Sequence, residues 1–168
     1  MTIATVGSVV YAGQMIETGQ TAEVHVVLDD GGFLAVRPQS RIQIDQAKIS
    51  GTFDDSLTLT LFRGAMRSIT GWVGKFDKSR YKLHVGTATI GIRGTDHEVV
   101  FIAEGQERPG EVAGIHNWVN EGGTTLQNTA GTVDIEPGHA GWLDHRGSRP
   151  QLHATLPDYL RDRRTRFE

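Results

Sequence analysis

Hydrophobic and polar residues alternate with a period of two along most of the chain. The alternation is clearest at residues 22–28, where every second side chain is apolar. A strand with this pattern buries one face and leaves the other in solvent. Residues 29–32, Asp-Asp-Gly-Gly, are typical of a hairpin turn, and residues 33–37 then form the partner strand. The same pattern predicts further strands at 42–44, 57–61, 81–85, 97–103, 112–119, 124–127 and 132–135.

Glycine-rich turns separate these strands. The chain has 21 glycines but only 5 prolines, which suits many tight turns because glycine reaches positive φ without a Cβ clash. Helical periodicity is missing from the body of the chain, and a short helix is predicted only around Pro157. We therefore predict an all-β single domain of short strands, β-solenoid-like or sandwich-like, at residues 1–155, followed by a polar basic tail at 156–168.

Composition excludes several classes of function. The 168 residues carry a formal net charge of -3, with 17 Lys and Arg against 20 Asp and Glu. Proteins that bind nucleic acid usually have a basic excess, so we expect no nucleic-acid partner. Cysteine is absent, which excludes disulfides and thiolate chemistry. No apolar run reaches the roughly 18 residues of a membrane span. The first residues lack the features of a signal peptide, so the chain is cytosolic or is exported with that peptide removed.

The sequence shows no convincing metal or catalytic site. Seven histidines are scattered along it, and the adjacent Asp96 and His97 would point to opposite faces of one strand. A nucleophile elbow of the G-x-S-x-G type is missing. The carboxylate pairs at 29–30 and 54–55 lie in polar or glycine-bearing loops, where a role in the turn is favoured. We expect no catalytic residue, no cofactor and no metal ion, and hence no enzyme.

The most unusual segment is Thr-Ala-Thr-Ile-Gly-Ile-Arg-Gly-Thr-Asp at residues 87–96. Its glycines predict a strand, a tight corner and a second strand. We expect Asp96 to accept backbone hydrogen bonds, and Arg93 to pair with Asp96 or to cap carbonyls of a neighbouring turn. We interpret the segment as mainly structural, with a recognition surface as the alternative. Its key residues are Thr89, Gly91, Arg93, Gly94, Thr95 and Asp96.

From Ile90 onward this segment resembles the signature of the FecR domain family. Three further blocks are similar to the family: Asp-Gly-Gly-Phe-Leu at 30–34 with Ser-Arg-Ile at 40–42, Leu-Phe-Arg-Gly-Ala-Met-Arg at 61–67 with Thr-Gly at 70–71, and residues 133–141 with Pro-Gly-His-Ala-Gly. The resemblance extends from about residue 7 to residue 143. Two features depart from the family: His97 stands where an aromatic or apolar residue is common, and a strand pair usual before residues 7–9 is missing.

The resemblance implies a β-solenoid-like fold outside the cytoplasmic membrane. Some family members are membrane-spanning regulators that pass a signal from a TonB-dependent outer-membrane receptor to a cytoplasmic sigma factor, and others are soluble envelope proteins. This chain lacks the anti-sigma segment and the spanning helix, so it resembles the soluble kind or the periplasmic part of a regulator. We expect a periplasmic or secreted, non-enzymatic protein that acts by protein contact in signalling or envelope assembly. A sheet edge that accepts a partner's strand is the natural mechanism.

Three tryptophans supply the alternative, a carbohydrate-binding module of the cell envelope with a polysaccharide partner. Exposed indoles stack on sugar rings or anchor a protein partner. Trp72, Trp118 and Trp142 are therefore candidate contacts for a sugar or a protein. Packing in the core or at a sheet edge is the competing interpretation for each of them.

Overall fold

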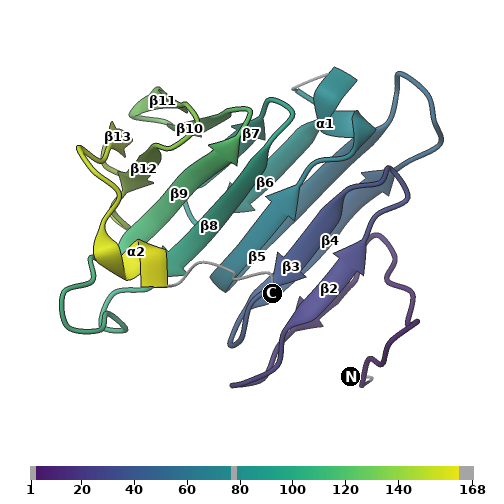
Figure 1. Ribbon diagram of the computed structural model, residues 1–168, viewed down its shortest axis with the longest axis horizontal. Helices are drawn as coiled ribbons and strands as arrows, with labels where there is room; N and C mark the ends of the chain where they lie inside the picture. The colour runs from purple at the N-terminus through teal and green to yellow at the C-terminus, as the bar shows by residue number, and fades with distance from the viewer. Residues whose placement is uncertain (1–2, 77–78, 163–168) are drawn as a thin grey trace.

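Thirteen strands and two short helices make up the computed structural model, which describes residues 3–76 and 79–162 (Figure 1). The first layer contains β1 (Met15–Glu17), β4 (Arg41–Lys48), β6 (Tyr81–Val85), β7 (Ala88–Ile92), β10 (Thr124–Asn128) and β11 (Gly131–Ile135). The second layer contains β2 (Val24–Val27), β3 (Phe33–Val36), β8 (Asp96–Ile102), β9 (Gly114–Glu121), β12 (Ala140–Leu143) and β13 (Gln151–Leu152).

Strand β5 (Ser56–Ile69) belongs to both layers and joins them. Its first half pairs with β4 antiparallel and with β6 parallel, whereas its second half pairs antiparallel with β3 and β8. The strand bends at Gly64, which has a φ of 88° and lies so close to Ser40 that a Cβ would overlap that residue. Glycine is therefore required at the bend, because other residues are strained at positive φ and would also collide with the neighbouring turn.

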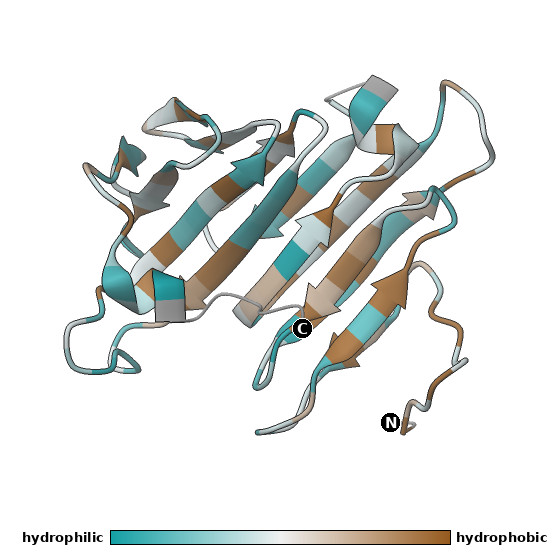
Figure 2. Ribbon diagram, viewed as in Figure 1, coloured by the Kyte–Doolittle hydropathy of each residue, from teal (hydrophilic) through white to brown (hydrophobic). Residues whose placement is uncertain are grey.

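Apolar side chains from both layers fill the space between them. Hydrophobic and polar bands alternate along the strands in Figure 2, as expected for strands with one buried face. In β5 the buried side chains Leu57, Leu59 and Leu61 face this core. A second, smaller cluster lies on the outer face of the second layer and contains Ala65, Val100, Ile102, Trp118, Ala140 and Leu160.

Helix α2 (Asp158–Asp162) covers this outer cluster. Leu160 is fully buried, and Leu156 and Tyr159 pack against the cluster. Pro157 immediately precedes the helix, which confirms the short helix predicted there. Residues 156–160 thus contribute to packing, and the division of the chain at residue 155 stays a prediction.

The all-β fold is confirmed, in a form with two facing layers. Helix α1 (Trp72–Phe76) was not predicted, because five residues are too few to reveal a helical period. Among the described residues, no helix is long and apolar enough to cross a membrane.

Candidate functional site

The corner between β7 and β8 carries the chain from the first layer to the second. Thr95 lies at its centre and is 3% exposed. Its hydroxyl donates to the Gly123 carbonyl at 2.6 Å, and its N–H donates to Thr70 Oγ1 at 2.7 Å. Its carbonyl accepts from the Thr70 N–H at 2.9 Å. Because Thr70 follows β5 and Gly123 lies between β9 and β10, this one threonine joins three loops.

Two glycines bring these loops together. The Gly94 N–H donates to the Gly74 carbonyl at 3.1 Å. Gly122 packs so closely against the Gly94 carbonyl that a Cβ on Gly122 would overlap it. Gly94 itself has a φ of 61°, but there is room beside it, since a Cβ would stand 3.6 Å from the Lys75 side chain. Its left-handed backbone is therefore the main requirement at this position.

Replacing Gly94 by valine is expected to lower the free energy of unfolding by about 1–2 kcal/mol, because a β-branched residue is strained in the left-handed region. Urea unfolding would measure the loss. Gly19→Ala is a matched control, since Gly19 has no positive φ and faces open space. A wild-type unfolding midpoint for Gly94→Val would show that the corner does not need a left-handed residue.

The Arg93 side chain does not pair with Asp96, which corrects one of the two arrangements predicted for it. Its Nη2 donates to Glu136 Oε1 at 2.7 Å, and the guanidinium lies against Gly123, where a Cβ would overlap it. The turn at Gly94 separates the two residues, and Asp96 already has a different basic partner. Glu136 has a side chain that is 62% exposed, so we expect this ion pair to add little stability.

Asp96 pairs instead with Arg67 from β5. Arg67 donates from Nε to Oδ1 at 2.8 Å and from Nη2 to Oδ2 at 2.5 Å, and Asn120 donates to Oδ1 at 3.3 Å. The two charged side chains are only 16% and 13% exposed. The hydrogen bonds that Arg67 donates to Asp96 raise the pKa of the Arg67 guanidinium above its usual value. This two-point ion pair connects β5 to the start of β8.

Thr89 and Gly91 lie on β7 itself, apart from these contacts. Thr89 Oγ1 is 3.1 Å from His84 Nδ1. A Cβ on Gly91 would stand at an ordinary 3.8 Å from Thr125, so no close approach requires glycine there. The structure thus brings the segment 93–96 together with neighbouring loops and leaves the other two motif residues on a strand.

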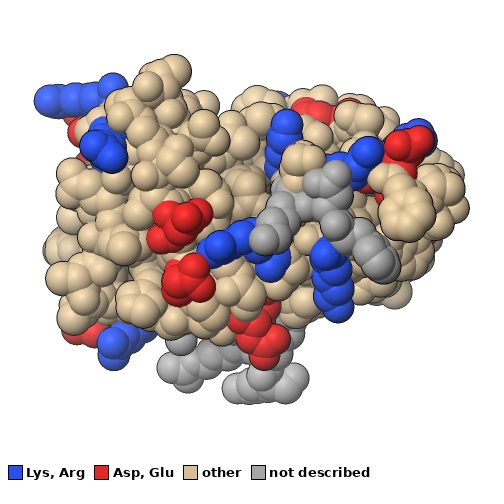
Figure 3. Space-filling model, turned by 90° about the horizontal axis from the view of Figure 1, so that it is seen from above, with Lys and Arg blue, Asp and Glu red and all other residues tan. Residues whose placement is uncertain are grey.

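The end of the molecule that carries the corner is seen from above in Figure 3. Basic and acidic side chains are interspersed on the face in view. The two ion pairs at the corner, Arg67 with Asp96 and Arg93 with Glu136, use charges of both signs. This arrangement favours pairing within the protein over recognition of a charged ligand at this end.

The three tryptophans lie in different surroundings and do not form one platform. Trp118 is 1% exposed and lies in the cluster beneath α2, so a ligand has no access to its indole. Trp142 is half-buried and stacks with the rings of His116 and His153, at centroid distances of 6.3 and 5.9 Å. Trp72 is 36% exposed, and its Nε1 donates to Asp55 at 3.2 Å.

Asp55 organises the loop between β4 and β5. It accepts hydrogen bonds from the N–H groups of Ser50, Gly51 and Thr52 and is 2% exposed. Burial acts to raise its pKa, but the hydrogen bonds from Ser50 and Trp72 outweigh burial and hold the pKa of Asp55 well below its usual range. These contacts indicate that the Asp55 carboxylate stabilises this loop. Across the described part of the chain, no three His, Asp or Glu side chains are grouped so as to hold a metal ion.

His97 lies in the core between the layers and is 0% exposed. Asn117 Nδ2 is 3.0 Å from both His97 Nδ1 and the Glu98 carbonyl, and Asn117 Oδ1 accepts from Thr124 at 2.6 Å. Both N–H groups of Asn117 are thus donated, so His97 Nδ1 accepts and Nε2 carries the proton. Nε2 has no hydrogen-bond partner among the described residues. Burial lowers the pKa of His97 to about 4.

Strand β2 lies at an edge of the second layer and pairs with β3 alone among the described strands. The Leu28 N–H donates to the Gly32 carbonyl. Hydrogen-bonded and non-hydrogen-bonded pairs alternate along an antiparallel ladder, so the N–H and C=O of Val27 point away from β3. The Val27 side chain is 77% exposed. This edge is a candidate for pairing with another chain.

Residues 14–119, more than half of the chain, match the model of the family described as FecR protein. The chain belongs to the FecR family. The match includes the corner at 93–96 and the edge strand β2, and it confirms the resemblance predicted from the motifs. No curated protein matches the chain.

Two solved structures share the fold of this FecR domain, both of a candidate anti-sigma factor from Parabacteroides distasonis. One has a TM-score of 0.64 at 9% identity and the other 0.65 at 11% identity. Each match covers 88% of this chain, but only 63% and 62% of the other chain, respectively. The chain thus spans less than two thirds of the length of these structural relatives.

Sequence reasoning missed several residues that build the corner of this FecR domain. Thr70 and Arg67 belong to the blocks that resemble the family, at 70–71 and 61–67. That membership was an available signal that they contribute to the same structural unit. Glu136 likewise lies in a family-like block, at 133–141, but its pairing with Arg93 depends on how β11 ends beside the corner.

Proposed function

We propose that this FecR-family chain is a non-enzymatic signalling domain of the cell envelope that acts by contact with a protein partner. The observation that carries the proposal is membership of the FecR family, and the fold it shares with a candidate anti-sigma factor supports a regulatory role. A periplasmic or secreted location follows from what the family implies. Envelope assembly through the same kind of contact is the other role that such a domain could have.

The edge of β2 is the proposed contact. An extended segment of a partner adds to an exposed sheet edge through main-chain hydrogen bonds, and the side chains beside it give specificity. Strand β2 has the sequence Val-His-Val-Val, without proline or lysine, two residues that commonly protect an edge from pairing. Val27 adds an exposed apolar side chain beside an outward-pointing N–H and C=O.

The other sheet edges are less suitable. Strand β13 has two residues and β1 has three, which gives few main-chain groups to a partner. Strand β11 lies beside β12 and β13, with which it makes contacts across the layers. Strand β2 therefore offers the longest uncovered apolar edge in this comparison.

Hydrogen exchange tests this contact directly. The probe is the purified periplasmic domain of a TonB-dependent outer-membrane receptor, the class of partner that the family implies. We expect the amides of β2 to exchange quickly in the free chain and to become protected in the complex. Val27→Pro removes an N–H that points away from β3, so it should abolish the protection while the β2–β3 ladder remains.

Val27→Lys is a second variant that keeps the N–H and adds a charge at the edge, and a thermal melt of both variants controls for folding. Protection of another surface, or binding unchanged in both variants, would overturn the β2 contact. Saturable binding of cell-wall polysaccharide that is lost in Trp72→Ala or Trp142→Ala would instead favour a carbohydrate-binding module.

A further inference from the structure

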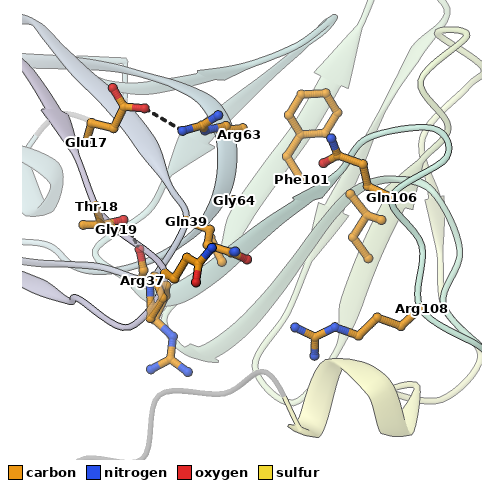
Figure 4. Close-up of a pocket in the computed structure, with 14 residues that line it drawn as sticks. Glu17, Thr18, Gly19, Arg37, Gln39, Arg63, Gly64, Phe101, Gln106 and Arg108 are labelled. Carbon is orange, nitrogen blue, oxygen red and sulfur yellow. Dashed lines mark hydrogen bonds and ion pairs between the residues drawn. The ribbon is translucent and has the colours of Figure 1, made fainter.

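We propose that a groove beside the bend of β5 binds an acidic, extended segment of a protein partner. The groove has a volume of about 970 Å³ and is named here the arginine groove. Its walls come from the end of β1 and the segment after it, the turn between β3 and β4, the bend of β5, and the end of β8 with the loop that follows it. Glu17, Gln39, Arg37, Arg63, Phe101 and Arg108 are among the residues that line it (Figure 4). This inference extends the proposed function, on which it rests for the nature of the partner.

Three arginines from three separate segments line the groove. Arg37 follows β3, Arg63 lies in β5, and Arg108 lies in the loop between β8 and β9. Among the described residues of the lining, Glu17 has the only acidic side chain. The chain as a whole has a net charge of -3, so this concentration of positive charge contrasts with its average surface. A cleft with an excess of one sign of charge, here three arginines against one glutamate, attracts ligands of the opposite sign.

Two of these arginines already bind carboxylates of the chain itself. Arg63 Nη2 is 2.5 Å from Glu17 Oε1, and Arg37 Nη1 is 3.2 Å from Glu23 Oε2. Arg108 is different, because in the part of the chain that the structure describes no acidic group lies within ion-pair distance of its guanidinium. A planar guanidinium binds carboxylates with two parallel hydrogen bonds. Arg108 can therefore bind a partner's carboxylate in the way that Arg63 and Arg37 bind carboxylates of the chain itself.

The backbone conformation of Gln39 is a second, independent indication that the groove is a binding site. Gln39 has a φ of 58° and is the only residue other than glycine with a positive φ among the described residues. It follows Pro38 in the turn between β3 and β4, a position where glycine is free of strain. Glutamine therefore costs the fold some stability there, and strained residues of this kind cluster at binding sites. Its exposed amide lines the groove and supplies both a donor and an acceptor.

The rest of the lining favours a peptide as the ligand. Phe101 and Pro38 are partly exposed and contribute apolar surface between the polar groups, and this surface fits the side chains of a peptide. An amide such as that of Gln39 matches the N–H and C=O groups of an extended backbone. Arg108 lies across the groove from Glu17, so a partner's carboxylate bound by Arg108 is kept apart from the negative charge of Glu17.

Peptide titration tests the proposal. The probe is a fluorescent peptide of alternating glutamate and leucine, compared with one in which glutamine replaces each glutamate. We expect saturable binding of the acidic peptide that weakens as salt increases. Arg108→Gln should weaken binding at least about fivefold. Arg146→Gln is the matched control, since its side chain is 78% exposed and lies outside the groove.

Gln39→Gly separates binding from folding. If the glutamine is retained for its side chain, this variant should melt at a higher temperature than the wild type and yet bind the acidic peptide more weakly. Unchanged affinity in both Arg108→Gln and Gln39→Gly would overturn the proposal. Equal binding of the acidic and the amide peptide would do the same. Equal competition by an oligosaccharide of uronic acids would overturn the assignment to a peptide.

The two proposals fail in distinguishable ways. If a receptor domain protects β2 and its affinity is the same for Arg108→Gln and the wild type, the groove assignment is wrong and the β2 contact stands. If the acidic peptide binds through Arg108 while receptor domains leave β2 unprotected, the groove assignment stands and the β2 contact is wrong.

Discussion

Asp96→Ala is expected to lower the free energy of unfolding by about 3 kcal/mol, a larger loss than at any other position of the corner. The substitution leaves the Arg67 guanidinium without the carboxylate that accepts from both Nε and Nη2. With a side chain 16% exposed, Arg67 recovers little hydration in exchange. Glu98 and Glu121 also raise the pKa of Arg67 by coulombic attraction. Urea unfolding at neutral pH would measure the effect.

Glu136→Ala is the matched control, because it removes the partner of Arg93 at an exposed position. We expect it to cost less than about 1 kcal/mol. A double-mutant cycle with Arg67→Ala and Asp96→Ala would separate the ion pair from other effects of each substitution. Equal losses for Glu136→Ala and Asp96→Ala would show that the pair does not anchor β8.

The corner also bears on the choice between structure and recognition. Thr95, Gly94 and Asp96 are each bound to another part of the chain, by hydrogen bonds or an ion pair. These contacts support the proposal that the motif mainly maintains the fold. It follows that an Asp96 variant should bind a partner normally once folded, whereas β2 and groove variants should fold normally and bind weakly. Affinity measured per folded molecule distinguishes the two groups.

The alternation of apolar residues was sufficient to predict most strands. Leu57, Leu59 and Leu61 show why: one buried face imposes a period of two, which is visible without knowledge of the neighbours. The same pattern did not reveal that β5 continues through Gly64. A glycine after an apolar run is typical of a reversal, and only the presence of two layers makes it a bend within one strand.

Contacts between distant residues were beyond sequence reasoning for a different reason. Arg93 and Asp96 are near in sequence, which favoured a pair, yet each pairs with a residue from another strand or loop. Trp118 was a candidate for exposure because nothing in its own strand shows that α2 covers it. The arginine groove has lining residues from four segments, and no short motif contains two of its arginines.

The stability of the domain should fall as pH decreases from 6.5 to 4, with His97 as a principal cause. In the unfolded chain His97 takes up a proton near its ordinary pKa of about 6.5. In the folded protein burial lowers the pKa of His97 to about 4, so between these values only the unfolded state binds the proton. The contribution of neutral His97 to stability is therefore fully present above pH 6.5. Between pH 6.5 and pH 4 it is lost by about 1.4 kcal/mol per pH unit, or about 3 kcal/mol in total.

The surroundings of His97 explain why the folded state resists this proton. Protonation places an N–H at Nδ1, opposite the Asn117 amide that already donates to it. Nε2 has no acceptor among the described residues. Asp96 acts in the opposite direction and favours the charged imidazole, but its carboxylate is held by Arg67 on the outer face of the sheet.

His97→Phe isolates this contribution, since the resemblance to the FecR family implies that an aromatic or apolar residue fits at this position. We expect the variant to lose about 1.4 kcal/mol per pH unit of the dependence between pH 6.5 and 4, measured by urea unfolding at several pH values. The free energy of unfolding of the variant at pH 7.5 does not test the prediction. Only the change of this free energy with pH depends on the proton bound to His97. His139→Gln, which removes an exposed imidazole, should retain the wild-type slope.

His153 is partly buried, and burial also lowers its pKa. His97→Phe can therefore retain part of the pH dependence of stability. If that remaining dependence disappears in the double variant His97→Phe/His153→Gln, it comes from His153, and the assignment of the larger part to His97 stands. A slope that is the same in His97→Phe and the wild type would show that His97 is not the buried group that resists protonation.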